Sequence, residues 1–199
     1  EWDTSDWVQK GNTVLGQGDD GFNSDVDRLG YSVDIAGDGL SYIAGTLFKD
    51  SASGDNEVGG ARVYEWNSSS STWVQKGSQI YGIDASDRYG QKVAMSKDGN
   101  VIAISSLIAN NVGGAFIVYK WDSSSSDWVQ ISSEFSHSDV GARGQGIDLN
   151  EDGDMVVIGA YYGTETFKTP SSTNVVGWGA VYGLEGGLGF LKDRVWVVA

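Results

Sequence analysis

The side chains that could do chemistry are restricted in type. The chain of 199 residues has one histidine, no cysteine and 27 acidic residues, 20 of them aspartate. Without cysteine, thiol catalysis and disulfide bonds are excluded. His137 lies between Ser136 and Ser138 and is followed by Asp139. A Ser-His-Asp triad depends on spatial geometry rather than on sequence order, so we interpret these residues as a polar loop.

Aspartate also recurs before glycine, at Asp38-Gly39, Asp98-Gly99 and Asp152-Gly153. Aspartate favours turns because its side chain bonds the nearby backbone, and Asp-rich loops also attract divalent cations. Both interpretations stay open, with the turn favoured. The sequence contains no P-loop, no paired zinc ligands and no dinucleotide fingerprint, and no carboxylate pair is singled out for glycoside hydrolysis. It therefore predicts a protein that is not an enzyme.

The charge and composition exclude two classes of partner. The formal net charge of −14 would repel nucleic-acid phosphates, so no nucleic acid is expected. No stretch approaches the roughly 18–20 apolar residues of a membrane span. The 29 glycines and single proline suit many tight turns between strands. The chain begins at Glu1 rather than methionine, from which we expect a processed chain or a fragment.

Three copies of one pattern organise the chain, and each copy predicts four strands. The first pattern occupies residues 29–45, 89–105 and 143–159. A second pattern follows at residues 59–77 and 113–132, with a degraded copy at 177–190. In the best-preserved copy we expect strands over residues 91–96, 101–107, 115–121 and 127–132. An Asp-Gly dipeptide between β-rich runs is a strong hairpin signal, and no helix is expected.

Four short antiparallel strands repeated at this period are typical of β-propeller blades. We therefore predict an all-β fold in a single repeat domain over residues 1–199. A partial blade covers residues 1–29, and three blades cover about 30–89, 90–143 and 144–199. Because three blades and a hairpin do not obviously close a ring, we expect a fragment of a larger propeller.

The phrases GxSVxIxxDGxxxIAG and GGAxxVYxW resemble the FG-GAP repeats of integrin α-subunit propellers, and more closely those of bacterial and algal FG-GAP-like proteins. The resemblance extends to about Tyr182. The Phe-Gly pair corresponds to Leu29-Gly30, Tyr89-Gly90 and Arg143-Gly144. The Gly-Ala-Pro phrase corresponds to Ala44-Gly45, Ser105-Ser106 and Gly159-Ala160, without the proline. The resemblance implies an adhesion or ligand-binding module that is extracellular or on the cell surface.

The same resemblance implies a Ca²⁺ loop in the first hairpin of a repeat. Such loops present oxygen ligands at alternate positions, which suits a hard cation. In the third copy Asp148, Asn150 and Asp152 occupy these positions, and Asp154 could replace the ligand that Val156 cannot supply. The corresponding loops of the first two copies keep fewer oxygen ligands. The sequence therefore predicts one calcium site, at Asp148, Asn150, Asp152 and Asp154, against the alternative of a plain hairpin turn.

Two further repeated features are interpreted as structural. Asp27-Arg28 and Asp87-Arg88 precede two of the copies. We favour an Asp turn with the arginine packed on a neighbouring aromatic ring, over a repeated contact site. Four tryptophans recur in register and are expected to pack within or between blades rather than to form a ligand platform: Trp66, Trp73, Trp121 and Trp128.

Taken together, the sequence predicts a non-enzymatic extracellular binding or adhesion module. Its partners would be proteins or glycans that contact the loops on one face of the propeller. The alternative is a structural subunit or segment of a larger assembly, in which other chains close the ring. Calcium is the one cofactor expected.

Overall fold

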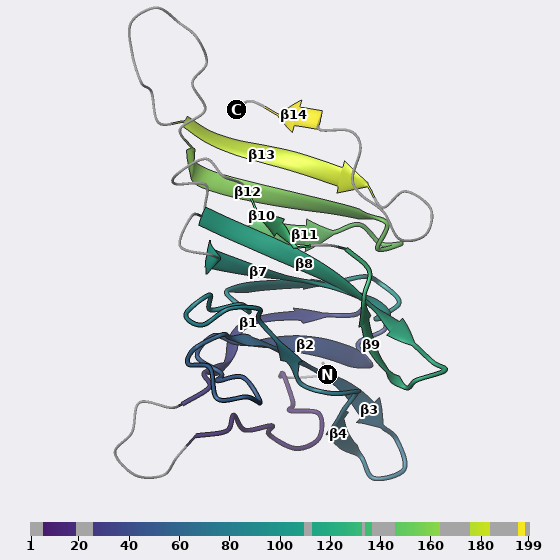
Figure 1. The fold of residues 1–199 in the computed structure, drawn as a ribbon. Helices are drawn as coiled ribbons and strands as arrows, with labels where there is room; N and C mark the ends of the chain where they lie inside the picture. The colour runs from purple at the N-terminus through teal and green to yellow at the C-terminus, as the bar shows by residue number, and fades with distance from the viewer. Residues whose placement is uncertain are drawn as a thin grey trace, which may run out of the picture.

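The computed structural model describes residues 6–18, 26–109, 113–132, 134–136, 146–163, 176–183 and 195–197. All regular structure in these segments is β, arranged as three antiparallel sheets that follow one another along the chain (Figure 1). The predicted all-β class with antiparallel strands is confirmed. Across the described segments the sheets close neither a barrel nor a ring. The same segments contain no helix long and apolar enough to cross a membrane.

The first sheet has the strand order β1-β2-β3-β4, with β5 paired to the other end of β3. Its strands are β1 (Leu29–Ile35), β2 (Ser41–Thr46), β3 (Gly60–Asn67), β4 (Thr72–Gln75) and β5 (Ile80–Tyr81).

The second sheet has the order β10-β8-β7-β6, with β9 also paired to β8. Its strands are β6 (Lys92–Met95), β7 (Val101–Ala109), β8 (Gly113–Asp122), β9 (Asp127–Gln130) and β10 (Phe135–Ser136). The third sheet, β11-β12-β13-β14, consists of β11 (Gly146–Leu149), β12 (Met155–Gly163), β13 (Val176–Gly183) and β14 (Val195–Val197). The four strands predicted in the second copy are present, and their ends shift by at most a few residues.

The three Asp-Gly turns adopt one conformation. Gly39, Gly99 and Gly153 have φ angles of 67°, 68° and 70°, in the left-handed region that favours glycine. Each donates its N–H to the carbonyl three residues earlier, at 2.9 to 3.0 Å. The predicted hairpins are therefore confirmed, and in each copy the turn fixes the register between the first and second strands.

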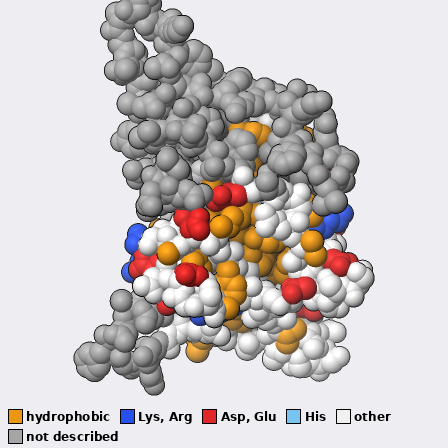
Figure 2. Space-filling view, in the orientation of Figure 1, with side chains coloured by type: hydrophobic (Ala, Val, Ile, Leu, Met, Phe, Trp, Pro, Cys, Tyr) orange, Lys and Arg blue, Asp and Glu red, His pale blue; other side chains and the backbone are white. Residues whose placement is uncertain are grey.

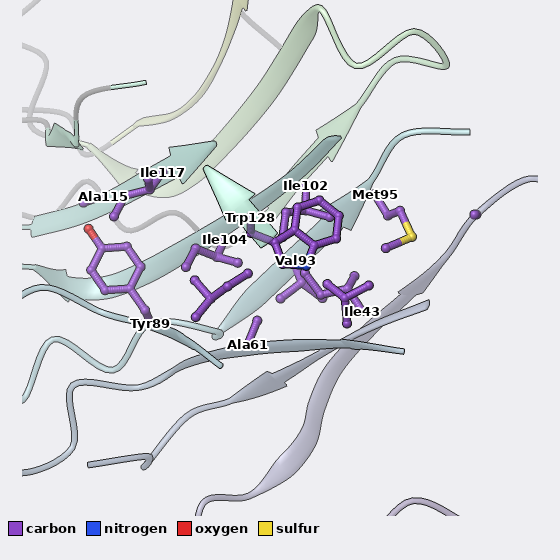
Figure 3. Close-up of a cluster of buried hydrophobic side chains, with 13 residues drawn as sticks. Ile43, Ala61, Tyr89, Val93, Met95, Ile102, Ile104, Ala115, Ile117 and Trp128 are labelled. Carbon is purple, nitrogen blue, oxygen red and sulfur yellow. The ribbon is translucent and has the colours of Figure 1, made fainter. Parts of the chain in front are cut away.

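The main core lies between the first and second sheets. Ile43 and Val63 of the first sheet face Val93, Ile102 and Ile104 of the second, and each of these side chains is at most 6% exposed. Figure 3 shows Ile43 and Ala61 on one side of this layer, with Ile102, Ile104 and Ile117 on the other. Burial of apolar area is the dominant favourable term in folding, so this layer holds the two sheets face to face.

A second core lies between the second and third sheets. Ala103, Phe116 and Val118 of the second sheet pack against Val156 and Ile158 of the third. The second sheet thus buries both faces, which explains the continuous apolar run from Val101 to Ile104 in β7. In the space-filling view, hydrophobic side chains gather across the middle of the described part of this face (Figure 2).

The first strands of successive sheets run in the same direction and lie side by side. β6 contacts β1 on one side and β11 on the other. Ser32 Oγ accepts the N–H of Val93 at 3.2 Å, and Asp34 Oδ2 accepts the N–H of Met95 at 2.7 Å. The side chains of β1 therefore satisfy backbone groups on the edge of β6 that has no paired strand.

A backbone ladder joins the Asp-Gly turns at one edge of the stack. Gly37 donates its N–H to the carbonyl of Lys97 at 2.8 Å, and Lys97 donates its own to the carbonyl of Glu151 at 3.0 Å. These three residues directly precede the aspartates of the three turns. We call this side of the stack the turn edge, and the side where β1 and β6 begin the strand-start edge.

The recurring tryptophans pack in pairs against the preceding part of the chain, as expected for structural rather than ligand-binding residues. Trp66 and Trp73 meet edge to face at 5.2 Å, and Trp121 and Trp128 do the same at 5.4 Å. Trp128 Nε1 donates to the carbonyl of Lys76 in the preceding sheet at 2.9 Å. Each aromatic pair therefore combines apolar burial with a satisfied indole N–H.

The N-terminal segment repeats this last arrangement. Trp73 Nε1 donates to the carbonyl of Lys10 at 2.8 Å, just as Trp128 does to Lys76. Gly11 and Gly77 both have a φ of 74° and lie against the ring of a tryptophan. Residues 7–11 therefore contact the first sheet as residues 73–77 contact the second.

Candidate functional site

The strand-start edge carries two similar corners, Asp27-Arg28 and Asp87-Arg88. Arg28 and Arg88 have φ angles of 50° and 59°, left-handed values that are uncommon for a side chain of this size. Asp27 stabilises its corner by accepting the N–H of Leu29 at 3.1 Å. Such backbone conformations cost about 1–3 kcal/mol each and persist only where the surroundings hold them.

The aspartate of the first corner belongs to a buried polar network. Arg62 Nη2 lies 2.8 Å from Asp27 Oδ2, and the two side chains are 4% and 2% exposed. Arg62 Nε also donates to Gln79 Oε1 at 2.6 Å, and Gln79 Nε2 donates to the carbonyls of Ala61 and Ile80. The network pairs its charges and is closed to solvent, so we assign it a structural role.

Arg28, which follows Asp27, belongs to a partly exposed group that we call the arginine cluster: Arg28, Phe48, Glu57 and Arg88. The guanidinium carbons of Arg28 and Arg88 lie 4.1 and 4.9 Å from the centre of the Phe48 ring. Arg88 also bonds Glu57 Oε2 through Nε at 2.9 Å and Nη2 at 2.6 Å. Both partners of that ion pair are 37% exposed. Within the described segments, Arg28 has no ion pair.

This geometry agrees with the favoured interpretation of the two corners, an Asp turn with an arginine on an aromatic ring. The sequence did not single out Phe48 or Glu57, which lie in the connection between β2 and β3. The two Asp-Arg pairs occupy the same position in the repeat, directly before Leu29-Gly30 and Tyr89-Gly90, and this was the available signal that the arginines share one edge. The matching residue of the third copy, Ala142, lies outside the described residues, as does His137.

The arginine cluster has the elements of an anion-binding surface. A guanidinium forms paired hydrogen bonds with phosphate or carboxylate, and it does so best when a neighbouring ring has already restricted its rotation. The face of an aromatic ring can also pack against the apolar side of a bound ring compound. Arg88 is paired with Glu57, so Arg28 carries the uncompensated positive charge of the cluster.

A second titratable pair near this edge is inaccessible. Tyr89, which follows Arg88, is fully buried, and its hydroxyl donates to Glu134 Oε1. Burial, reinforced by the neighbouring Glu134 carboxylate, raises the pKa of Tyr89 above its ordinary value. The phenol therefore stays protonated and acts as part of the core (Figure 3).

The predicted calcium loop lies on the opposite, turn edge. Asn150 Nδ2 donates to Asp154 Oδ1 at 2.6 Å, and Asn150 Oδ1 accepts the N–H of Met155 at 2.9 Å. Asp148 Oδ1 accepts the N–H of Leu149 at 2.9 Å. The structure thus brings Asn150 and Asp154 together, while Asp152 is exposed in the turn.

In the described part of the chain, no group of three or more His, Cys, Asp or Glu side chains is placed to hold a metal ion. Calcium binding at Asp148, Asn150, Asp152 and Asp154 stays a prediction. A calorimetric titration with millimolar Ca²⁺ tests it, and the absence of a binding heat would reject it.

No family model and no curated protein matches this sequence. The fold does match solved structures. One is described as a "putative 6-phosphogluconolactonase" from Bacteroides uniformis, with a TM-score of 0.51 and 11% identity over 92% of this chain. A second, with the same description and from Bacteroides fragilis, has a TM-score of 0.51 and 12% identity over 83% of this chain. The chain spans only 43% and 38% of the lengths of those two proteins.

These likenesses correct the family assignment. The similar structures are described as lactonases, not as FG-GAP or integrin-like proteins, so the predicted FG-GAP membership is wrong. The resemblance misled because the repeated sequence pattern reflects general requirements of antiparallel sheets. Glycines, an alternating strand, an Asp-Gly turn and a buried strand are what any repeated antiparallel sheet needs, so they do not distinguish one repeat family from another.

The functional prediction is corrected with it. A non-enzymatic adhesion module followed from the FG-GAP resemblance and from the lack of an obvious catalytic motif. The described structural neighbours are enzymes by name, which overturns both the adhesion function and the prediction that the chain is not an enzyme. A linear motif could not reveal the arginine cluster, because its residues come from separate connections. The extracellular location and the protein or glycan partners stay predictions.

Proposed function

We propose that the three sheets are blades of a β-propeller, and that the chain belongs to a hydrolase that opens a sugar lactone carrying an anionic group. Stacked antiparallel sheets of four or five strands with parallel first strands support the propeller arrangement. The fold likeness to two structures named after 6-phosphogluconolactone supports the substrate class. Because the chain spans less than half of either, the proposal concerns the whole enzyme to which these blades contribute.

The observation that carries the proposal is the arginine cluster on the strand-start edge. Arg28 and Arg88 come from the corners before two adjacent sheets and flank one partly exposed aromatic ring. A phosphate group between these guanidiniums would accept charge-assisted hydrogen bonds from both. The Phe48 ring would lie against the sugar ring.

The carboxylate of Glu57 is the base in this proposal. It is held by Arg88 in a half-exposed ion pair, so a phosphate that draws Arg88 away would release the carboxylate for proton transfer. Water adds to the lactone carbonyl carbon while Glu57 accepts one of its protons. The ring C–O bond then breaks, and the departing ring oxygen takes the proton from Glu57. The product is an open-chain hydroxy acid.

Hydrolysis of 6-phosphogluconolactone and of unphosphorylated gluconolactone, each corrected for spontaneous opening, tests the proposal. Arg28→Gln is expected to raise the KM for the phosphorylated lactone roughly tenfold or more, and to leave the KM for the neutral lactone unchanged. Glu57→Gln is expected to lower kcat for the phosphorylated lactone by about 10²-fold or more, and to affect the neutral lactone less, because that substrate has no phosphate to release Glu57 from Arg88.

The turn edge offers matched controls. Lys97 and Glu151 form an ion pair of the same kind at 2.9 Å, on the opposite side of the stack. Lys97→Gln and Glu151→Gln are therefore expected to leave both kinetic constants unchanged. Hydrolysis no faster than in buffer would contradict the proposed activity. Equal effects of Arg28→Gln on the two lactones would contradict the assignment of the phosphate site.

A further inference from the structure

Backbone strain in the described segments is concentrated around the arginine cluster. Six residues other than glycine have a positive φ in these segments, and two of the six lie in the Ser-rich turns. The other four lie in the cluster or directly beside it: Arg28, Glu57, Ser86 and Arg88. Such conformations persist only where the surroundings hold them, and they are frequent at functional sites. Glu57 alone among the four carries a carboxylate, so the contacts that hold its main chain also place the proposed base.

The main chain of Glu57 is bonded on two sides. Its N–H donates to Asp50 Oδ1 at 2.7 Å, and its carbonyl accepts the N–H of Arg88 at 3.1 Å. The carbonyls of Asn56 and Val58, on either side of it, accept N–H groups from the same segment before β6. The left-handed φ of 52° at Glu57 is therefore held by hydrogen bonds to the backbone, independently of its side chain.

Asp50 joins the two arms of the connection between β2 and β3. At the base of this connection Gly59 donates its N–H to the carbonyl of Lys49 at 2.9 Å, and at its tip residues 51–55 bond to one another. Between these two places the arms are linked by a side chain, because the N–H of Glu57 donates to the Asp50 carboxylate. The other carboxylate oxygen, Oδ2, accepts no hydrogen bond within the described segments. The Asp50 side chain thus makes one contact, and that contact is with Glu57.

The hydrogen bond from Glu57 to Asp50 does not depend on the ion pair that phosphate would break. The proposed mechanism draws the Arg88 guanidinium away from the Glu57 carboxylate. The bonds at the main chain of Glu57 involve neither of those two groups, so they remain when the ion pair opens. The released carboxylate therefore still extends from a fixed backbone position. This matters because a reacting group misplaced by about 1 Å can cost roughly 10²-fold in rate.

From these observations we propose that Asp50 is a positioning residue for Glu57, an inference that rests on the proposed function. Asp50 holds the main chain of the base in its left-handed conformation, and it thereby determines where the carboxylate lies after Arg88 has turned to the phosphate. It acts through Glu57 and contacts neither the lactone nor the phosphate. The role requires an acceptor oxygen at Oδ1 rather than a negative charge, and an asparagine side chain can supply that oxygen.

Steady-state hydrolysis of 6-phosphogluconolactone tests the assignment. Asp50→Ala is expected to lower kcat about tenfold or more and to change KM less than about twofold, because the phosphate-binding Arg28 is untouched. Asp50→Asn is expected to keep kcat within about twofold of the wild type, since its amide oxygen can accept the same N–H. Asp55→Ala is the matched control and should leave both constants unchanged, because the Asp55 carboxylate bonds the serines of its own turn.

A spectroscopic readout separates this inference from the proposed activity. Arg88 Nε donates its N–H to Glu57 Oε2 at 2.9 Å, so the NMR resonance of that N–H reports where the carboxylate lies. Its loss in Arg88→Leu assigns the resonance. Asp50→Ala is expected to shift it and to speed its exchange with water, whereas Asp50→Asn and Asp55→Ala leave it in place. If no lactone is hydrolysed but the resonance responds in this way, the proposed function is rejected while Asp50 still positions Glu57.

Two results would overturn the positioning role. An Arg88 resonance that is unchanged in Asp50→Ala would mean that Glu57 keeps its place without Asp50. Equal losses of kcat in Asp50→Ala and Asp50→Asn, or a rise in KM as large as the fall in kcat, would indicate a general loosening of the connection. Asp50→Glu keeps the test independent of how well the alanine variant folds. It retains the charge but moves the oxygens by one methylene, so it too is expected to lower kcat and to shift the resonance.

Discussion

The two edges of the stack differ in what they repeat. At the turn edge, three Asp-Gly turns share one backbone conformation, and a ladder of backbone hydrogen bonds links them. At the strand-start edge, the corners before β1 and β6 share a left-handed arginine conformation but differ in their ion pairs. The first corner has a buried Asp27–Arg62 pair, and the second has a half-exposed Arg88–Glu57 pair. The comparison separates a repeated scaffold from a surface that has diverged, and the candidate chemistry lies on the diverged surface.

The largest expected effect comes from breaking the buried pair at the strand-start edge. Arg62→Leu should lower the free energy of unfolding by about 3–5 kcal/mol, because Asp27 would remain buried without its cation. Denaturant unfolding measures this. Arg88→Leu, which removes an exposed pair, should cost no more than about 1 kcal/mol. Equal losses of unfolding free energy in the two variants would contradict the difference in burial between the two ion pairs.

A smaller effect is expected at the turn edge. Gly39 has a φ of 67°, and a side chain added there would meet no atom within 4 Å. Gly39→Ala should therefore cost about 1–2 kcal/mol through backbone conformation alone. Gly39→Asn should cost less, since asparagine tolerates this region. Thermal unfolding of the two variants checks the order, and a larger loss with asparagine would indicate that an unseen contact matters.

The contact between the first two sheets should respond to acid. Asp127 accepts the N–H of Ser78 at 2.8 Å, and this bond is the main reason that the pKa of Asp127 lies below its ordinary value. A lowered folded-state pKa contributes stability above the unfolded value of about 4, and that stability is lost as pH falls through the folded pKa. Asp127→Asn should therefore flatten the stability profile below about pH 4, as unfolding at a series of pH values would measure.

The smallest effect is expected from the exposed pair at the turn edge. Lys97 and Glu151 are 59% and 75% exposed, so solvent and salt screen their attraction. Lys97→Gln should change the free energy of unfolding by less than about 0.5 kcal/mol. A larger loss, persisting in high salt, would mean that the side chains rather than the backbone ladder hold this edge together.

The sequence predicted the local structure well because its signals are local. The Asp38-Gly39, Asp98-Gly99 and Asp152-Gly153 dipeptides specify left-handed turns, and the alternation around Trp121 specifies a strand with one apolar face. The positions of the strands in the second copy followed directly. The tryptophan packing followed from the equal spacing of residues that must be buried.

The candidate site was not predicted because its members share no local pattern. Phe48 and Glu57 lie in a connection whose length differs between copies, so aligning the repeats gives no equivalent residues to compare. Their contacts with Arg28 and Arg88 form only when two sheets stack. The family assignment failed for a related reason. The repeated sequence pattern determines the turns and the strand pairing, but it does not determine which residues lie on the loops around each strand.

The turn ladder also sets the pitch of the molecule. Gly37, Lys97 and Glu151 link successive units through backbone atoms alone, so these links do not depend on the side chains at the three positions. At the opposite edge, the carbonyls of Asn56 and Glu57 accept N–H groups of the next unit, whereas residues 51–55 bond to one another. The turn over residues 51–55 can therefore be lengthened or replaced while the stack keeps its dimensions. Loops grafted into this turn would therefore be displayed at a fixed position on a rigid stack of sheets.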